Sequence, residues 1–280
     1  MGKRLKVRKY FLVDNGSFGA QAILNLRKIA NSLAKSSGFE VRPMGLMHSH
    51  KVNPSALDGI AGESMEAFLD SEEANFVSDI RVVPFFLGPS LAVTDWLPRN
   101  LEKWRLGGKG RSFVILDSLY QKGDNRIARS LSGECIKEMN TKFYNKPFLV
   151  LVDHGTPVAK VNEVREQIGA TLADLLKDRI SGFSTCSMER RPDPCYDFNE
   201  PLLAELLTNC TLKGISEILV AQLFLSPGRH AGKKGDIHEI CSKFLHQNSG
   251  SFTLSRTETI GGDPLVLEIL KDRIKEDNLN

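Results

Sequence analysis

The chain has 280 residues, which is enough for one large domain or two domains of ordinary size. Hydrophobic residues make up 41% of it and charged residues 25%, a composition that is typical of folded globular proteins and excludes disorder throughout. The net charge of +3 does not by itself indicate a nucleic-acid partner, and no apolar run approaches the roughly 20 residues that a membrane helix needs.

The first half of the chain alternates predicted strands and helices. An apolar run at Tyr10–Val13 fits a strand that is buried on both faces. Apolar residues then recur at helical spacing from Ile23 to Ala34, which predicts an amphipathic helix. Further strands are predicted near Val41–Met47, at Ile80–Leu87 and at Phe113–Asp117, with another helix before the second of these three.

The second half has the same order of predicted elements. A strand at Phe148–Val152 is followed by helical spacing from Val161 to Leu176. Asp263-Pro264 is typical of a helix start, with an N-cap and a proline in the first turn, and the last helix continues through Leu270. The other strands are predicted at Ile180–Cys186, Glu217–Leu225 and Ser251–Thr257.

Two segments of the first half recur in the second. Tyr10–Ser17 resembles Leu149–Thr156, and Val82–Pro89 resembles Val220–Pro227, both at an offset of roughly 138 residues. Two matches in nearly one register indicate an internal duplication.

The alternation of strands and helices predicts the fold class. It is typical of α/β proteins, in which parallel sheets carry helices on both faces. Two such units meet near Tyr144–Pro147. We therefore expect two duplicated domains, 1–145 and 146–280.

Two histidines of the second half follow predicted strands. His154 follows the strand predicted at Phe148–Val152, and Gly155 lets the backbone turn sharply there. His230 ends the segment that begins at Pro227, in a loop rich in glycine and lysine. In open parallel sheets, functional residues gather beyond the carboxyl ends of the strands. If the two strands are neighbours, both imidazoles face one opening and can hold a divalent metal ion with positions left free.

Charged residues accompany these histidines. Glu189 follows the strand expected near Ile180–Cys186 and could be a general base, a third metal ligand or an exposed carboxylate paired with a neighbouring arginine. Few aromatic residues interleave with the cations, so a nucleic-acid surface is not indicated. Five basic residues suit a ligand with several carboxylates or phosphates: Arg190, Arg191, Arg229, Lys233 and Lys234.

The first half differs at the matching positions. Asn15 stands where His154 stands in the second half, and His48 lies near the position that matches Glu189, with His50 two residues further on. We expect that the first half has kept the fold and lost the chemistry. A separate metal site at His48 and His50 is the alternative.

These motifs resemble the CbiX-type sirohydrochlorin chelatases, a branch of the class II chelatases. The resemblance covers nearly the whole chain as two chelatase-like halves, the first degenerate and the second carrying the candidate site. Between Glu189 and Glu200 the chain has extra residues, and the loop from His230 to Asp236 is longer than the family pattern. The residues that carry the resemblance are His154-Gly155, Glu189, Glu200-Pro201, Pro227–His230 and Asp236-Ile237.

The resemblance implies a lyase that inserts cobalt or iron, as a divalent ion, into sirohydrochlorin or a related acidic tetrapyrrole of sirohaem or cobalamin biosynthesis. His154 and His230 would bind the metal, and with Glu189 they would form the catalytic set. The basic residues would bind the carboxylates of the substrate. We expect no organic cofactor, no nucleic acid and no membrane as partners, and no use of ATP, because no GxxxxGK[ST] loop occurs.

Two other function classes stay open. One is a non-catalytic metal or tetrapyrrole carrier that uses the same site. The other is an unrelated hydrolase or transferase, although no Gly-x-Ser-x-Gly elbow is found. An internal duplication can replace a homodimer of single-domain units, so a monomer is favoured and a homodimer remains an alternative.

Cysteine usage bears on the compartment. The chain has five cysteines and no C-x-x-C pair, which argues against a disulfide framework and favours reduced, buried thiols. The basic segment Met1–Lys9 is not followed by a long apolar stretch, so no secretory signal is expected. We expect a cytoplasmic protein, or one of an organelle stroma if a targeting peptide has been removed.

Overall fold

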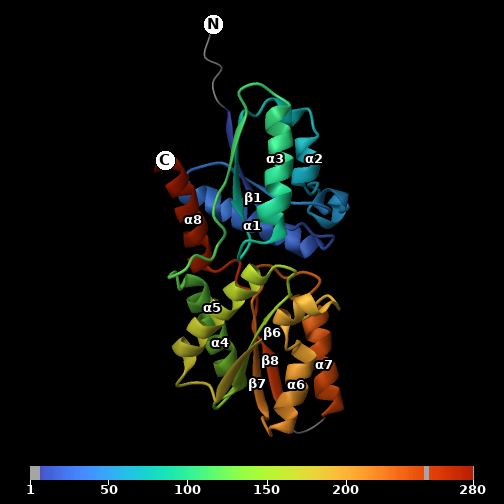
Figure 1. Cartoon of the computed structure of the whole chain (residues 1–280), viewed down its shortest axis with the longest axis vertical. Coiled ribbons are helices and arrows are strands. Elements are labelled where there is room, and N and C mark those ends of the chain that lie inside the picture. The colour runs from blue at the N-terminus through green and yellow to red at the C-terminus, as the bar shows by residue number, and fades with distance from the viewer. Residues whose placement is uncertain (1–6, 249–251, 280) are drawn as a thin grey trace. The chain divides into compact units, whose positions relative to one another are not determined.

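The computed structural model describes residues 7–248 and 252–279 (Figure 1). The chain divides into two compact units. Unit 1 comprises Met1–Leu119 with Leu267–Asn280, and unit 2 comprises Tyr120–Val266. In the described ranges, none of the helices is both long and apolar enough to cross a membrane.

Unit 1 contains a four-stranded parallel sheet of order β2-β1-β3-β4. Short 3-10 segments lie at Ser49–Lys51, Pro54–Ala56 and Glu73–Asn75, and a π-helical turn at Ala92–Trp96 precedes α3. The strands and helices are β1 (Arg8–Asp14), α1 (Ala20–Ser37), β2 (Val41–Gly45), α2 (Met65–Leu69), β3 (Asp79–Pro84), α3 (Leu97–Leu106), β4 (Ser112–Ile115) and α8 (Pro264–Leu279).

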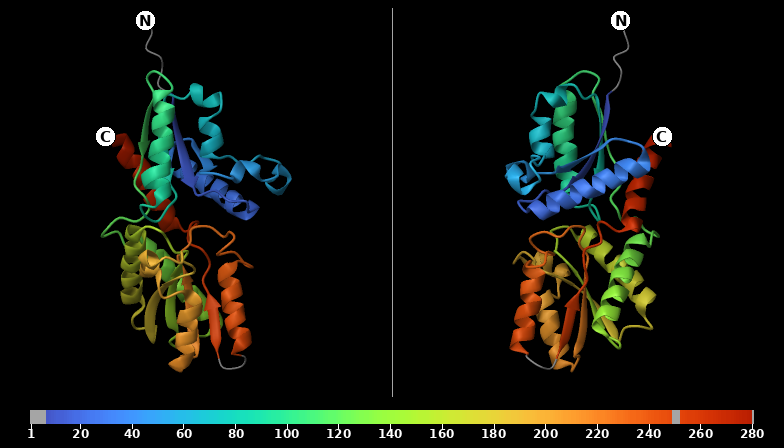
Figure 2. Two further views of the ribbon diagram at one scale, coloured as in Figure 1. Left: turned by 45° about the vertical axis from the view of Figure 1, so that its right-hand side comes forward. Right: turned by 180° about the vertical axis from the view of Figure 1, so that it is seen from behind.

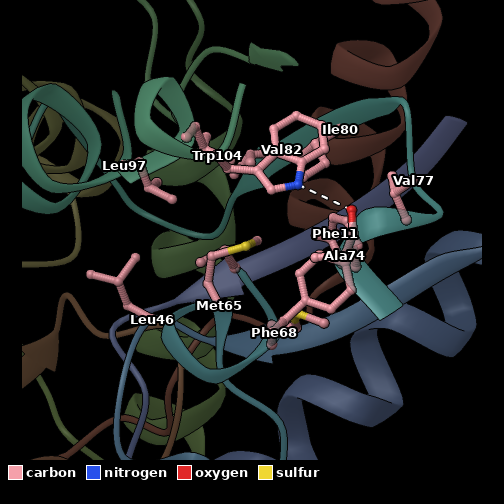
Figure 3. Packing of buried hydrophobic residues seen from close by; sticks show 13 residues of the cluster. Phe11, Leu46, Met65, Phe68, Ala74, Val77, Ile80, Val82, Leu97 and Trp104 are labelled. Carbon is pink, nitrogen blue, oxygen red and sulfur yellow. Dashed lines mark hydrogen bonds between the residues drawn. The ribbon is translucent and has the colours of Figure 1, made fainter. Parts of the chain in front are cut away.

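One face of this sheet packs against α2 and α3. Alternate β1 residues, Phe11 and Val13, belong to the same buried cluster as Met65 of α2 and Leu101 of α3. Figure 3 shows this cluster, in which the indole nitrogen of Trp104 donates to the carbonyl oxygen of Ala74 at 3.1 Å. The polar end of the indole is therefore satisfied inside the core.

The other face of the sheet carries α1 and α8. Hydrogen bonds tie α8 to it, because Asp277 accepts from the Tyr10 hydroxyl at 2.8 Å and from Arg81 at 2.6 Å. Arg273 of α8 donates to the carbonyl oxygens of Ser118 and Leu119. These contacts explain why the last helix of the chain belongs to the first compact unit.

Unit 2 repeats the architecture with a parallel sheet of order β6-β5-β7-β8. A 3-10 segment at Pro194–Asn199 precedes α6. The strands and helices are α4 (Arg126–Lys142), β5 (Phe148–Asp153), α5 (Ala159–Leu176), β6 (Gly182–Ser187), α6 (Leu203–Leu212), β7 (Glu217–Gln222), α7 (Asp236–Gln247) and β8 (Thr253–Arg256).

Helices also cover both faces of this second sheet (Figure 2). Val150 and Val152 of β5 pack with α6 and α7, including Phe244. On the opposite side α5 approaches closely at Gly169, where an added Cβ would lie 2.9 Å from Thr185 of β6. The helix α4 packs beside α5 on that side. The predicted α/β class, with helices on both faces of two parallel sheets, is confirmed.

Equivalent hydrogen bonds recur in the two units. Gly16 N–H donates to the Asp14 carboxylate at 2.8 Å, and Gly155 N–H donates to Asp153 at 3.1 Å. The segments that follow the third and fourth strands of each sheet are also joined alike. Leu119 N–H donates to the Phe86 carbonyl in unit 1, and Ile260 N–H donates to the Phe224 carbonyl in unit 2. These matched bonds are consistent with the duplication.

The compact units do not coincide with the ranges 1–145 and 146–280 expected from the repeat. Each sheet does lie within one of those ranges, but α4 packs in unit 2 and α8 packs in unit 1. The helix after the fourth strand of each half therefore joins the other unit. The two ranges remain a prediction about the origin of the duplicated segments.

The predicted strands are confirmed with somewhat different ends. The strands β2, β3 and β7 stop two or three residues earlier than expected, whereas β6 starts two residues later and ends one residue later. The strand expected at Ser251–Thr257 spans Thr253–Arg256, and Ser251 lies outside the described residues. All five cysteines are free, and only Cys195 is exposed. Burial raises the pKa of Cys135 and Cys241 to about 12, which favours unreactive thiols.

Asp14 and Asp153 end the first strands of the two sheets but differ in their partners. Asp153 pairs with the buried guanidinium of Arg165. No cation pairs with Asp14 among the described residues, and burial raises its pKa from 3.8 to about 6. At pH 5 Asp14 is therefore largely protonated in the folded protein and largely ionised in the unfolded chain. The contribution of Asp14 to the free energy of unfolding falls as pH rises from about 4 to about 6.

Replacing Asp14 with asparagine is expected to stabilise unit 1 at pH 8 by about 1–3 kcal/mol, because it removes a desolvated charge while keeping an acceptor for Gly16. Near pH 4 the variant and the wild type should be equally stable. Both tryptophans, Trp96 and Trp104, lie in unit 1, so urea unfolding followed by their fluorescence isolates this effect. A gain that does not change with pH would contradict the prediction.

Candidate metal centre

The candidate site lies at the carboxyl edge of the unit 2 sheet. Because β5 pairs with β6 on one side and β7 on the other, the segments that follow these three strands are adjacent. His154 follows β5, Glu189 follows β6, and His230 lies in the loop between β7 and α7. The two strands that precede the histidines are therefore neighbours, which was the condition for both imidazoles to face one opening.

The turn after β5 brings Glu189 to His154. Gly155 has a φ of +92°, and an added Cβ would lie 1.9 Å from the Glu189 carbonyl oxygen. The two segments are joined by the Glu189 N–H, which donates to the His154 carbonyl at 3.2 Å. The side chains then meet, with His154 Nε2 3.4 Å from Glu189 Oε1. The glycine is required because the backbones approach too closely for any side chain.

The loop that carries His230 is folded on itself. Gly232 N–H donates to the Gly228 carbonyl at 3.0 Å, and Ile237 N–H donates to the His230 carbonyl at 3.1 Å. Arg256 of β8 donates to the Lys233 carbonyl at 3.1 Å. The glycines and cations of this segment therefore belong to a loop with internal hydrogen bonds, which holds His230 at the sheet edge.

The two imidazole rings are in contact. Their centroids are 4.5 Å apart and their planes are inclined at 74°. The Nδ1 atom of His230 lies 2.5 Å from Asp236 Oδ2, and that of His154 lies 3.0 Å from the Gly155 carbonyl oxygen. Because Nδ1 of His230 faces a carboxylate, the His230 tautomer protonated at Nδ1 is favoured, which leaves its Nε2 lone pair available to a metal ion.

The side chains present fit a metal in transit better than a closed structural site. His154 is 45% exposed and His230 28% exposed, so solvent and a ligand can reach both rings. Among residues 7–248 and 252–279, no three His, Cys, Asp or Glu side chains form a cluster with metal-binding geometry. Two imidazoles with open positions can bind an ion while leaving it free to exchange ligands.

Two of the predicted substrate-binding residues have partners within the protein. Arg190 donates to Glu200 at 2.7 Å and pairs with Asp197 at 3.2 Å. Arg191 stacks on Tyr196, with its guanidinium carbon 5.4 Å from the ring centroid. These contacts hold the segment after Glu189 together, and a role of the two arginines in ligand binding stays a prediction.

The other three basic residues lie on the His230 loop and face solvent. The Arg229 side chain is 84% exposed, with its Nε 3.9 Å from the Asp236 carboxylate. Lys233 and Lys234 are exposed, and neither forms an ion pair within the described part of the chain. These three cations are therefore available to an anionic ligand that approaches the two imidazoles.

The sequence interpretation missed the role of Asp236. The motif Asp236-Ile237 does not by itself identify this carboxylate as the partner of His230. A signal was present, because Asp236 begins α7 six residues after the histidine and lies within one loop of it. A carboxylate bonded to Nδ1 fixes the ring orientation and increases the basicity of the opposite nitrogen.

The histidines of unit 1 do not form an equivalent arrangement. The close approach of Gly155 to the Glu189 carbonyl has its match where Gly16 approaches the Met47 carbonyl, so Met47 rather than His48 corresponds to Glu189. His48 stacks on Phe18, and His50 contacts the Ser64 hydroxyl. A metal site of His48 with His50 stays without support.

Replacing Asp236 with asparagine is expected to weaken Co²⁺ binding by about 10–100-fold, the usual cost of losing a carboxylate behind a metal-bound imidazole. The amide keeps the size of the side chain, so the fold should be retained. Isothermal titration with Co²⁺ measures the change, and Asp178→Asn, an exposed aspartate of the same unit, serves as the control. Equal affinity in Asp236→Asn and the wild type would show that Asp236 does not orient His230.

Residues 148–277 match the family model CbiX. Among curated protein sequences, no match to the chain is found.

Solved structures extend the likeness to nearly the whole chain. SirB from Bacillus subtilis with Fe³⁺ superposes with a TM-score of 0.68 at 13% identity, covering 96% of this chain and 95% of SirB. The sirohydrochlorin chelatase SirB of Bacillus subtilis subspecies spizizenii in complex with cobalt gives the same score and identity, covering 96% and 94% of the two chains.

A third solved structure is CbiX, the terminal enzyme of sirohaem biosynthesis in denitrifying bacteria. It has a TM-score of 0.59 at 14% identity and covers 97% of this chain and 99% of CbiX. At these identities the matches establish the fold. Together with the family match they bear out the resemblance: residues 148–277 match the CbiX family model, in a chain with the two-sheet fold of the sirohydrochlorin chelatases.

Proposed function

We propose that this protein inserts a divalent metal ion, Co²⁺ or Fe²⁺, into sirohydrochlorin or a related acidic tetrapyrrole without using ATP. The observation that carries the proposal is the contact between His154 and His230, whose ring centroids are 4.5 Å apart at the carboxyl edge of the CbiX domain. The SirB neighbours were solved with Fe³⁺ and with cobalt, which supports these metals as candidates.

The two imidazoles would receive the metal ion. Neutral imidazole is a good ligand for first-row divalent ions, and two such ligands leave coordination positions for the pyrrole nitrogens. The ion is a substrate, so it must leave as readily as it arrives. A site with only two protein ligands suits that requirement, because fewer bonds must be broken during the transfer.

Glu189 would accept a proton. Insertion replaces two pyrrole N–H protons with one M²⁺ ion, so two protons must leave the macrocycle for each metal that enters. The Glu189 side chain is 61% exposed and lies 3.4 Å from His154, so it can take up a proton near the metal and release it to water. Charge is conserved in this exchange and no oxidant is needed.

The exposed cations would hold the substrate carboxylates. Arg229, Lys233 and Lys234 extend from the same loop as His230. An acidic tetrapyrrole carries several carboxylates at its rim, and charge-assisted hydrogen bonds to them would orient the ring over the imidazoles. The absence of a GxxxxGK[ST] loop from the sequence supports insertion without ATP.

The test is metal insertion by the full chain under anaerobic conditions without nucleotide. Sirohydrochlorin and Co²⁺ are mixed with the protein, and the change in absorbance of the macrocycle gives the rate. His154→Ala and His230→Ala are each expected to lower this rate at least about 100-fold, because each removes a metal ligand. His246→Ala, which removes an exposed histidine of α7, is the matched control.

Two outcomes would contradict the proposal. If the protein binds Co²⁺ and sirohydrochlorin but does not accelerate insertion, it is a carrier that uses the same site. If both histidine variants insert metal at the wild-type rate, the reaction takes place elsewhere on the protein. A retained rate in His246→Ala shows that loss in the other variants comes from the site.

A further inference from the structure

Unit 1 contains a cavity beside Asp14 that has no role in the proposed metal insertion. Its volume is about 250 Å³, several times the roughly 30 Å³ that one water molecule occupies in the liquid. It lies between α1, β2 and the segment that leads to α2. The helix α1 is the long blue helix of Figure 2. Its lining includes Asp14, Leu26, Arg27, Gly45, Ser49 and Glu63.

The internal repeat shows what fills the corresponding place in unit 2. Asp14 is paired in register with Gly45, and Asp153 with Ser187. Arg165 lies 12 residues after Asp153, and Leu26 lies the same distance after Asp14. Both helices begin at the same offset from the aspartate. Arg165 and Ser187 of unit 2 therefore correspond to Leu26 and Gly45 of unit 1.

In unit 2 the aspartate is neutralised by a buried cation. The Arg165 side chain is 2% exposed, with its Nη1 3.3 Å from Asp153 Oδ1 and 2.5 Å from the Ser187 hydroxyl. Ser187 in turn donates to Asp153 at 2.6 Å. In unit 1 both of these partners are replaced by residues that offer no side-chain hydrogen bond.

The two other charged side chains that line the cavity, Arg27 and Glu63, have partners elsewhere in the protein. Arg27 lines the cavity, but its guanidinium donates to the carbonyl oxygens of Leu57, Ile60 and Ala61 at 2.9–3.0 Å. Glu63 forms an ion pair with Arg42. Asp14 accepts from the backbone N–H of Gly16, and the described residues supply it with no cation. A desolvated carboxylate without a counter-charge is costly, and a cationic ligand would remove that cost.

We propose that this cavity of unit 1 binds a small organic cation bearing a guanidinium group, which pairs with Asp14 as Arg165 pairs with Asp153 in unit 2. The planar fork of a guanidinium matches a carboxylate with two parallel hydrogen bonds. Leu26 and Pro43 supply apolar walls for the carbon chain of the ligand, and Ile60 is exposed at the rim. Because unit 1 has Leu26 where unit 2 has Arg165, no guanidinium from the protein fills this space, and the ligand would occupy it.

The test is a calorimetric titration of the full chain with methylguanidinium at pH 8. We expect saturable binding with a dissociation constant of roughly 1 mM or below. Methylurea has nearly the same shape without the charge and should not bind. Asp14→Asn should abolish binding, and Leu26→Arg should abolish it by supplying the cation from the protein itself. Lys28→Ala, on the exposed side of α1, should leave it unchanged.

A change of pH gives an independent readout. The pKa of Asp14 is about 6, so its charge is largely lost at pH 5 and methylguanidinium affinity should fall about tenfold between pH 8 and pH 5. The other charged groups that line the cavity, Arg27 and Glu63, are held by the protein partners named above. Asp14→Asn should show no such pH dependence.

Two further ligands separate the sources of the guanidinium. Tighter binding of free arginine than of its N-acetyl, C-amide derivative would assign the cavity to a free small molecule, and the reverse would assign it to an arginine side chain of a peptide. No saturation at about 10 mM methylguanidinium, ten times the expected constant, would overturn the proposal. So would equal binding of methylurea or retained binding in Asp14→Asn. If Leu26→Arg does not fold, these arms still decide.

Discussion

Replacing Glu189 with glutamine is expected to slow metal insertion by about 10²–10⁴-fold, the range usual for loss of a general base. The amide cannot accept a pyrrole proton, although it has the size of the carboxylate and can still contact His154. Both imidazoles remain, so Co²⁺ affinity should change little. A large effect on the rate with a small effect on binding would separate proton transfer from metal capture.

The experiment compares two measurements on the same variants. Anaerobic insertion of Co²⁺ into sirohydrochlorin gives the rate, and calorimetric titration with Co²⁺ alone gives the affinity. Glu205→Gln, an exposed carboxylate on α6 of the same unit, is the matched control and should retain both. If Glu189→Gln lost metal affinity and rate in equal proportion, Glu189 would be a metal ligand and not the proton acceptor.

The second large effect concerns stability. Arg165→Leu, which installs the residue that unit 1 has at the matching position, is expected to destabilise unit 2 by about 3–5 kcal/mol. The reason is that Asp153, which lies at the start of the His154 turn, would remain buried without its cation. Urea unfolding followed by far-UV circular dichroism measures the loss, because unit 2 contains no tryptophan.

A double-mutant comparison tests the cause. Asp153→Asn combined with Arg165→Leu removes both charges, so the pair should be less destabilised than the sum of the two single variants. Arg179→Leu, an exposed arginine after α5, should change stability by no more than about 0.5 kcal/mol. If Arg165→Leu were as mild as Arg179→Leu, the buried ion pair would not stabilise the turn.

The placement of the candidate site followed from local features of the sequence. A buried strand is recognised as a short apolar run, and both β1 and β5 contain such a run of buried residues. In a parallel sheet all carboxyl ends lie at one edge, so residues that directly follow strands are brought together whichever strands are neighbours. His154 and Glu189 each lie within two residues of a strand end, so their place at the sheet edge could be predicted without knowledge of distant contacts.

Other features depended on contacts between distant segments. Arg165 lies at helical spacing with Val161 and Ile168, which places it on the buried face of α5. The sequence does not show that its guanidinium contacts Asp153 and Ser187, because these residues belong to other segments of the chain. Arg190 similarly donates to Glu200, which lies ten residues further on across an irregular segment, and so is less available to a ligand. Such pairings are set by loop geometry, which periodicity does not describe.

By itself the sequence determined the α/β class and indicated the internal repeat, and it predicted His154 and His230 as site residues, because strand burial and strand-end position are local properties of the chain. Only the tertiary structure decided that α4 and α8 each pack in the other unit, that Asp236 contacts His230, and that Asp14 lies beside a cavity without a cation. Each of these depends on which surfaces meet after folding, and hence on energies shared between residues far apart in the chain.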